Sequence, residues 1–427
     1  MSRFIRQDYP LIGESVLRLT HKSGLRVFLI PRQGKEAFAL FGTKYGAMDH
    51  RFCVGEREVN VPDGIAHFLE HKLFENEDGT DTFSRFAALG ASANAFTSNE
   101  MTAYLFSATG NYHESLEVLL DFVTHPYFTP ATVEKEQGII GQEIRMYEDD
   151  PDYRLYFGLL NCLYREHPIK IDIAGTVESI AKITDQTLYD CYNTFYHPQN
   201  MALVLCGPFE EDRVEAVCDK VLKVPAPLEL TRTPPYEPRE IAAPRISRHF
   251  PVAMAQFAVG LKETELGGDA DAFLKRVAAQ EVALAVHFGR TSPFFNRLYE
   301  AGTLSEVFST TYQFLDSCAF TIFQGESDEA ETVAKEIRNT LKSVKNAELS
   351  DEDFEIARRA TYSNLIQSLN SPSDVATQYL SFAFLGLDLF RLAETVANLK
   401  KEDVIERISH WDEALVAESF ILPKKGD

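Results

Sequence analysis

Two imidazoles and one carboxylate stand within five residues of this chain, in the run His67-Phe68-Leu69-Glu70-His71. If the run is helical, His67, Glu70 and His71 occupy positions i, i+3 and i+4, which share one face of the helix. Neutral imidazoles in that arrangement can hold a Zn²⁺ ion. The carboxylate between them is then free to act on a water molecule that the metal polarises.

The neighbouring residues favour a helix with one polar and one apolar face. Pro62-Asp63-Gly64 is typical of a turn and a helix start. The apolar face would consist of Ile65, Phe68, Leu69 and Leu73. Two other interpretations of the motif stay open at this stage, a buried hydrogen-bonded histidine pair and a chance match. With 11 histidines in the chain, a chance match is expected in roughly a few per cent of such sequences.

A catalytic zinc ion usually takes three protein ligands and one water, so a third ligand is required. The segment 129–147 is predicted to be a helix, because Thr129 suits the N-cap and Pro130 suits the first helical position. Glu136 and Glu143 are seven residues apart and therefore share a face of that helix. They are candidates for the site, although two solvated surface carboxylates would show the same spacing.

The chain contains two related halves, and the candidate site residues occur in only one of them. A strand-like run followed by an amphipathic helix is found at 103–123 and again at 319–344. Aligning the halves matches His67 with Ala279, Glu70 with Val282, His71 with Ala283, Glu136 with Ala357 and Glu143 with Asn364. Loss of these residues from one copy, with the apolar pattern kept, is expected if they serve chemistry rather than packing.

The bulk properties predict two domains. A chain of 427 residues with 45% hydrophobic content can form two sizeable cores. The proline-rich segment 224–248 is interpreted as a linker, which places a metal-binding domain at 1–223 and a related domain without ligands at 249–427. Each half mixes strand-like runs with long helices. This predicts an α+β fold in which an antiparallel or mixed sheet is covered by helices.

Charge and cysteine usage restrict the partners and the compartment. A net charge of −22 argues against nucleic acid as a partner. The charge is explained either by solubility or by an acidic chamber that favours basic peptides. The first residues lack an apolar signal core, and no stretch reaches membrane-spanning length. Six cysteines without Cys-x-x-Cys spacing are typical of thiols in a reducing compartment. We therefore expect a cytoplasmic protein with no membrane partner.

These motifs resemble the pitrilysin/insulinase zinc peptidases, the inverzincins, whose zinc motif has the order His-x-x-Glu-His. The resemblance rests on the runs 67–71, 90–98, 136–143, 172–180 and 195–201. It covers the first half strongly and the second half through the duplication. Within the family, the chain is most similar to the bacterial YmfH-type proteins, which have the size of one half of a clamshell.

The resemblance implies a zinc metalloendopeptidase that hydrolyses peptides in an enclosed chamber. His67, His71 and Glu143 would hold one Zn²⁺ per chain. Glu70 would take a proton from the attacking water and pass it to the leaving amine, without a covalent intermediate. Glu136 would orient one of the ligating histidines.

The resemblance also implies an edge strand at Asn94 and Ala95 that binds the substrate backbone by β-augmentation. The chain departs from the family at an Arg/Tyr pair that helps hold the substrate, because the two positions read Tyr299 and Glu306. We therefore expect a homodimer, or a heterodimer whose paralogous subunit supplies the pair. The alternative is a non-catalytic or partner-dependent subunit of a peptidase or peptide-binding complex.

Overall fold

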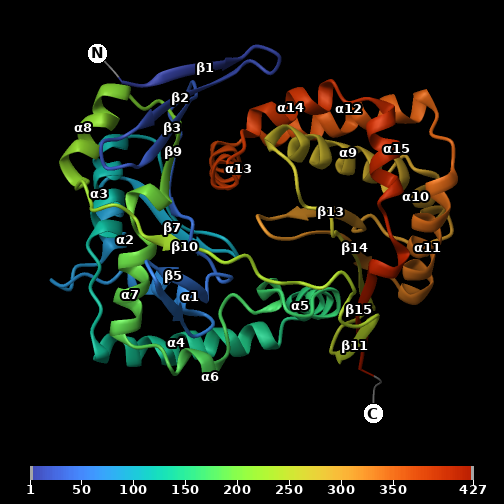
Figure 1. Cartoon of the computed structure of the whole chain (residues 1–427), viewed down its shortest axis with the longest axis horizontal. Coiled ribbons are helices and arrows are strands. Elements are labelled where there is room, and N and C mark those ends of the chain that lie inside the picture. Colours follow the sequence, from blue (N-terminus) through green and yellow to red (C-terminus); the bar gives the residue numbers. More distant parts are fainter. Residues whose placement is uncertain (1–2, 425–427) are drawn as a thin grey trace. The chain divides into compact units, whose positions relative to one another are not determined.

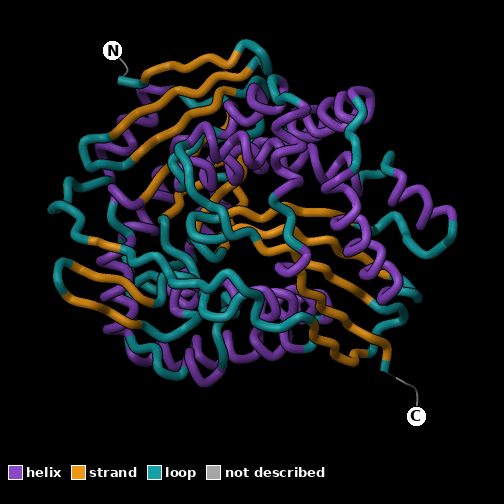
Figure 2. Tube along the Cα trace, turned by 45° about the vertical axis from the view of Figure 1, so that its right-hand side comes forward, coloured by secondary structure: helices purple, strands orange, loops and turns teal. Residues whose placement is uncertain are grey.

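The structure is a computed structural model that describes residues 3–424. The chain folds into two compact units, and each unit contains segments from both halves of the sequence (Figures 1 and 2). The first unit contains the chain up to Ile144 together with Ile171–Thr233 and Ser368–Phe390. The second contains Arg145–Lys170, Pro234–Gln367 and the chain from Arg391 onward.

A seven-stranded sheet forms the centre of the first unit, in the order β1-β2-β3-β9-β4-β8-β7. Its strands are β1 (Ile5–Tyr9), β2 (Glu14–Thr20), β3 (Arg26–Pro31), β9 (Met201–Gly207), β4 (Ala37–Thr43), β8 (Thr102–Ala108) and β7 (Ala91–Thr97). Only β3 and β9 run parallel. Every residue of β4 and β9 is buried, so the core lies at these central strands. β7 pairs with β8 alone and forms one edge of the sheet.

A five-stranded sheet forms the centre of the second unit, in the order β11-β15-β12-β14-β13. Its strands are β11 (Arg245–Phe250), β15 (Val416–Pro423), β12 (Gln256–Lys262), β14 (Ala319–Glu326) and β13 (Ser309–Phe314). β11 and β15 run parallel, whereas the other neighbours are antiparallel. The five strands β3-β9-β4-β8-β7 of the first sheet have the same order and the same relative directions. The repeat confirms the predicted internal duplication and the predicted α+β fold of mixed sheets covered by helices.

The helices follow the same duplication. Those of the first half are α1 (Ile65–Lys72), α2 (Thr82–Ala88), α3 (Tyr112–Thr124), α4 (Pro130–Glu148), α5 (Pro151–Leu163), α6 (Val177–Ile180), α7 (Asp185–Phe195) and α8 (Glu211–Val221). Those of the second half are α9 (Ala270–Phe288), α10 (Pro293–Glu300), α11 (Ala330–Ser343), α12 (Asp351–Ser368), α13 (Pro372–Phe384), α14 (Leu389–Ala397) and α15 (Lys401–Ser409). Short 3₁₀ turns occur at Pro168–Lys170, Pro198–Asn200, Val344–Asn346 and Glu413–Leu415.

The two halves exchange one helix. α5 belongs to the first half in sequence but packs against β11, β12 and β15 of the second unit. α13 belongs to the second half and packs against β4 and β9 of the first unit. The exchange explains why each unit is discontinuous in sequence.

The segment 224–248, predicted to be a linker, is not wholly irregular. It supplies β10 (Leu230–Thr231), which joins β5 (Arg51–Val54) and β6 (Arg57–Asn60) in a small sheet, and it ends in the first residues of β11. The boundaries at 223 and 249 stay predictions about the two duplicated halves. No helix in the described part of the chain is long and apolar enough to cross a membrane.

Both exchanged helices lie against a glycine of a central strand. A Cβ atom at Gly42 would lie 2.6 Å from Leu380 Cδ2 of α13. A Cβ atom at Gly260 would lie 2.8 Å from Leu163 Cδ1 of α5. These separations are shorter than van der Waals contact, so a larger residue would push the helix off the sheet.

We expect Gly42→Val and Gly260→Val each to lower the free energy of unfolding by about 1–3 kcal/mol, because overpacking a dense core forces side chains out of their preferred rotamers. Urea unfolding monitored by circular dichroism measures the effect. Gly110→Val is the matched control, since no atom lies within 4 Å of a Cβ placed there. Equal stability of all three variants would contradict the packing described here.

Candidate metal centre

Helix α1 is a short helix that is buried on most of its surface. Phe68 and Leu69 are fully buried and provide the predicted apolar face. The helix begins after Gly64, whose φ of 89° and close approach to the Ala174 carbonyl both require glycine. Ser179 Oγ donates to the Asp63 carbonyl at 2.8 Å. The run 172–180 therefore fixes the start of α1.

Helix α4 packs beside α1 and presents its carboxylates to the polar face of that helix. It begins as predicted, with Pro130 as its first residue and Thr129 Oγ1 accepting the Thr132 N–H at 3.3 Å. Lys72 at the end of α1 is fully buried, and its Nζ donates to the Thr132 carbonyl at 3.4 Å. Val133, one residue further along α4, is also buried.

The structure brings His67, His71 and Glu143 together. His67 Nε2 lies 3.7 Å from Glu143 Oε1, and His71 Nε2 lies 3.6 Å from Glu143 Oε2. Among the described residues, these three form the one group of histidine, cysteine or acidic side chains whose donor atoms all lie within 4.8 Å of one another. The geometry therefore assembles the three side chains that the sequence proposed as ligands.

Glu136 holds the other nitrogen of His71. Its Oε1 lies 3.1 Å from His71 Nδ1, and its side chain is only 9% exposed. Burial acts to raise the pKa of Glu136, but the hydrogen bond to His71 and the charges of His71, Lys72 and Lys135 together outweigh it, so the pKa is lowered. An ionised Glu136 accepts the Nδ1 proton, so the lone pair of the neutral ring is on Nε2, the nitrogen that faces Glu143.

The pKa values of the two imidazoles shift in opposite directions. Burial, together with the neighbouring His71, lowers the pKa of His67 to about 4. Burial also acts against the charged form of His71, but the hydrogen bond to Glu136 and the nearby carboxylates raise its pKa overall. His67 Nδ1 is buried and has no hydrogen-bond partner in the described chain. His67 is therefore neutral at pH 7 and can offer Nε2 to a metal ion.

The donor set fits zinc. Ligand atoms 2.0–2.2 Å from a tetrahedral Zn²⁺ lie about 3.3–3.6 Å from one another, close to the two nitrogen–oxygen separations given above. Two imidazole nitrogens and a carboxylate are a set that catalytic zinc sites use, with the fourth position left for water. His67, His71 and Glu143 could thus hold the ion with little rearrangement.

Glu70 lies on the same face of α1 as the two histidines and makes a different contact. Its Oε2 accepts a hydrogen bond of 2.8 Å from Thr97 Oγ1. Burial raises the pKa of Glu70, and the Thr97 hydrogen bond opposes that rise in part. Thr97 is absent from the predicted site residues. The sequence placed it in the run 90–98 without indicating that its hydroxyl reaches α1.

Asn94 and Ala95 lie in β7, the edge strand of the first unit, and α1 packs against this strand. The outer side of β7 has no strand partner in the described chain. Asn94 is exposed, and its Oδ1 accepts the Ala95 N–H at 2.9 Å. The position of β7 is compatible with the predicted binding of a peptide backbone beside the metal ligands.

Tyr299 and Glu306 occupy the two positions at which the resemblance expects an arginine and a tyrosine. They contact each other, with Tyr299 Oη donating to Glu306 Oε1 at 3.2 Å. Both side chains are exposed. The departure seen in the sequence is therefore present in the structure as a polar pair without a positive charge.

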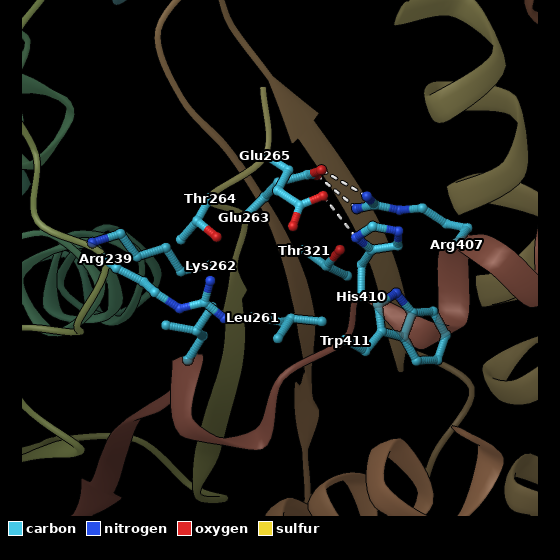
Figure 3. Close-up of a pocket in the computed structure, with 11 residues that line it drawn as sticks. Arg239, Leu261, Lys262, Glu263, Thr264, Glu265, Thr321, Arg407, His410 and Trp411 are labelled. Carbon is cyan, nitrogen blue, oxygen red and sulfur yellow. Dashed lines mark hydrogen bonds and ion pairs between the residues drawn. The ribbon is translucent and has the colours of Figure 1, made fainter. Parts of the chain in front are cut away.

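The second unit has no corresponding metal centre among its described residues. Ala279, Val282 and Ala283 of α9, at the positions matched to the candidate site, are buried and carry no metal-binding atom. A polar cavity of about 30 Å³ does lie in this unit, lined among others by Glu263, Arg407 and His410 (Figure 3). Arg407 binds both oxygens of Glu263 at 2.6 Å. The volume suits about one water molecule, and the buried carboxylate is neutralised by arginine.

Comparison with known proteins identifies the family. Two sequence models match the chain, insulinase (peptidase family M16) at residues 52–177 and the peptidase M16 inactive domain at 182–361. The uncharacterized zinc protease YmfH of Bacillus subtilis (strain 168) is 42% identical over 407 residues, which are 93% of this chain and 94% of that protein. The chain belongs to the insulinase family, peptidase family M16. This confirms the family that the motifs predicted.

Two solved structures share the fold. The crystal structure of an M16-like peptidase from Alicyclobacillus acidocaldarius superposes with a TM-score of 0.93 at 35% identity, covering 98% of this chain and 100% of that one. The periplasmic protease PqqL from Escherichia coli gives a TM-score of 0.75 at 15% identity and covers 95% of this chain. Only 47% of the PqqL chain is matched, so this fold corresponds to about half of that protein.

We expect substitutions at the acidic residues of α4 to separate metal ligation from ligand orientation. Glu143→Gln should abolish stoichiometric Zn²⁺ binding, because it removes one of three ligands. Glu136→Gln should retain Zn²⁺ with about 10- to 100-fold lower affinity, as is typical for loss of the group that orients a ligating histidine. Titration with a competing chelator measures both. Glu148→Gln, exposed at the end of α4, is the control, and loss of metal from it would contradict the assignment.

Proposed function

We propose that this insulinase-family chain is the metal-bearing subunit of a zinc-dependent endopeptidase. The observation that carries the proposal is the convergence of His67 Nε2, His71 Nε2 and the Glu143 carboxylate, with Glu70 on the same helix face. The relative YmfH carries the name of a zinc protease, which supports a peptidase. One Zn²⁺ per chain is expected, since the described residues contain one such donor group.

A zinc ion held there would polarise a water molecule and lower its pKa. Glu70 is the side chain placed to take the proton of that water and to deliver it to the leaving amine. Because burial raises the pKa of Glu70, this carboxylate is a stronger base than an exposed one. Asn94 and Ala95 would hold the substrate along the edge of β7, so that the peptide backbone rather than the peptide sequence would be recognised.

The pair Tyr299 and Glu306 supports dependence on a partner. Neither residue can supply the positive charge that an arginine would offer to a substrate carbonyl or to a developing oxyanion. The match to about half of PqqL supports an active assembly built from two such folds. We propose a heterodimer with a paralogous chain that provides the missing arginine and tyrosine and closes the chamber. A homodimer, or a subunit without turnover, is the alternative.

We also propose a cytoplasmic location, which the cysteines support. Five of the six cysteines are buried thiols, and burial raises the pKa of four of them, Cys162, Cys191, Cys206 and Cys218. Such thiols are protonated and unreactive at neutral pH. They act as small apolar core residues and fit a reducing compartment.

We expect Glu70→Gln to retain Zn²⁺ and to lower the hydrolysis of an internally quenched peptide by about 10²–10⁴-fold, the usual contribution of a general base. Metal content and peptide turnover are measured on the same preparation. Glu134→Gln, which alters an exposed carboxylate of α4, should behave as wild type. Equal turnover by Glu70→Gln and wild type would remove Glu70 as the base.

We expect the isolated chain to bind Zn²⁺ and to cleave peptides at least about tenfold more slowly than a mixture with a paralogous chain that carries the arginine and tyrosine, since transition-state contacts of this kind typically contribute 10²–10³ in rate. A peptide-cleavage titration against the second chain measures the effect. Tyr299→Arg with Glu306→Tyr in the isolated chain tests the homodimer, which this pair of changes should activate. High turnover by the unmodified chain alone would contradict partner dependence.

A further inference from the structure

Thr97 makes a contact with the proposed catalytic base that the sequence did not suggest. It is the last residue of β7, and its Oγ1 donates to Glu70 Oε2 at 2.8 Å. Among the described residues, Thr97 is the one side chain that donates a hydrogen bond to the Glu70 carboxylate. The contact joins the edge strand directly to helix α1.

A second threonine, Thr102, lies beside the Thr97 hydroxyl. Thr102 is paired with Thr97 across the β7–β8 hairpin, and their hydroxyl oxygens are 3.3 Å apart. Thr102 Oγ1 donates to the Tyr45 carbonyl at 2.9 Å. A hydroxyl has one proton, so Thr102 can offer Thr97 only an acceptor and competes with Glu70 for the Thr97 proton. The Glu70 carboxylate is the nearer acceptor, at 2.8 Å against 3.3 Å, and a charged acceptor forms the stronger hydrogen bond.

The Glu70 side of this contact is buried, whereas Thr97 is partly exposed. Thr102 and Tyr104 are fully buried, and Glu70 is 8% exposed. Tyr104 Oη lies 2.8 Å from Tyr196 Oη, and burial, reinforced by the Glu70 charge, raises the pKa of both phenols. A hydrogen bond to a carboxylate is stronger away from water. Losing it would leave Glu70 free to change its rotamer.

We propose that Thr97 is a positioning residue that holds one oxygen of the Glu70 carboxylate and leaves the other oxygen to exchange a proton. This inference rests on the proposed peptidase function. Because β7 also contains Asn94 and Ala95, one strand would set the position of both the substrate backbone and the base. The distance between the scissile bond and the base on α1 would then depend on the contact of Thr97 with Glu70.

The first test uses Thr97→Val, which keeps the shape of the side chain and removes its hydroxyl. In the assembly that cleaves peptides, kcat should fall by roughly 10- to 100-fold, the effect of misplacing a catalytic group by about an ångström. KM and Zn²⁺ affinity should change less than about twofold, since neither the substrate strand nor the ligands are altered. Thr97→Ser should restore at least half of the activity. An unchanged kcat in Thr97→Val, or equal losses in both variants, would overturn the proposal.

The second test does not depend on turnover or on metal. Thr97→Val, Glu70→Ala and the double variant form a mutant cycle that urea unfolding of the metal-free protein can measure. Thr97→Val should lower the unfolding midpoint in wild type and lower it less than half as much in Glu70→Ala. Additive midpoints would show that the two side chains do not interact and would overturn the proposal. Absence of cleavage by wild type with a coupled cycle would instead count against the peptidase function alone.

Discussion

Burial of the polar helix α1 is the constraint on which the site depends. Moving an unpaired polar group out of water costs roughly 2–7 kcal/mol, and a charged group costs more. An isolated helix of eight residues is not stable in water, so α1 must be held by its neighbours. Glu136 pairs with His71, Thr97 with Glu70, and the Thr132 carbonyl with Lys72. The two Nε2 atoms lie 3.7 and 3.6 Å from the Glu143 carboxylate, and these are the atoms that a metal ion held there would bind.

The spacing of α4 gives His71 a carboxylate on each side. Glu136 and Glu143 are seven residues apart, or about 10.5 Å along the helix axis. Glu136 contacts Nδ1 of the ring and Glu143 lies beside Nε2. One carboxylate therefore sets the tautomer of His71, and the other would share a bound cation with this ring. Neither role can pass to the other residue, because each acts on a different nitrogen of the same imidazole.

The second half of the chain shows which residues the fold accepts at the positions of the candidate site when no metal ligands are present. α9 carries Ala279, Val282 and Ala283 at the matched positions, and all three are buried. Apolar side chains require no hydrogen-bond partners, and their burial contributes directly to stability. The fold therefore tolerates an apolar face at this position. The first half instead buries two imidazoles and three carboxylates, and removing these polar groups from water costs free energy. Packing alone does not require that cost, and this is the physical reason to assign the five side chains to function.

Local features of the sequence predicted much of this site. The start of α4 at Pro130 and the shared face of Glu136 and Glu143 follow from helix periodicity and capping, which act within a few residues. The position of β7 at a sheet edge came from the family resemblance. The order of strands in the repeat was not predicted, because strand pairing joins residues far apart in sequence. The family assignment likewise rested on motifs that local geometry alone would not distinguish from chance.

The contacts that escaped prediction are those between distant segments. Thr97 is 27 positions from Glu70, and a threonine at the end of a strand is ordinarily explained by β-propensity. Only the packing of α1 against β7 shows that its hydroxyl has a charged acceptor. The exchange of α5 and α13 also escaped prediction. An apolar helix face indicates that a helix is buried, but it does not indicate which sheet covers the helix. Gly42 and Gly260 are the residues of the two central strands against which the exchanged helices pack. A glycine at a buried central strand position weakens the strand unless another element approaches closely, so each indicates that a helix must pack there.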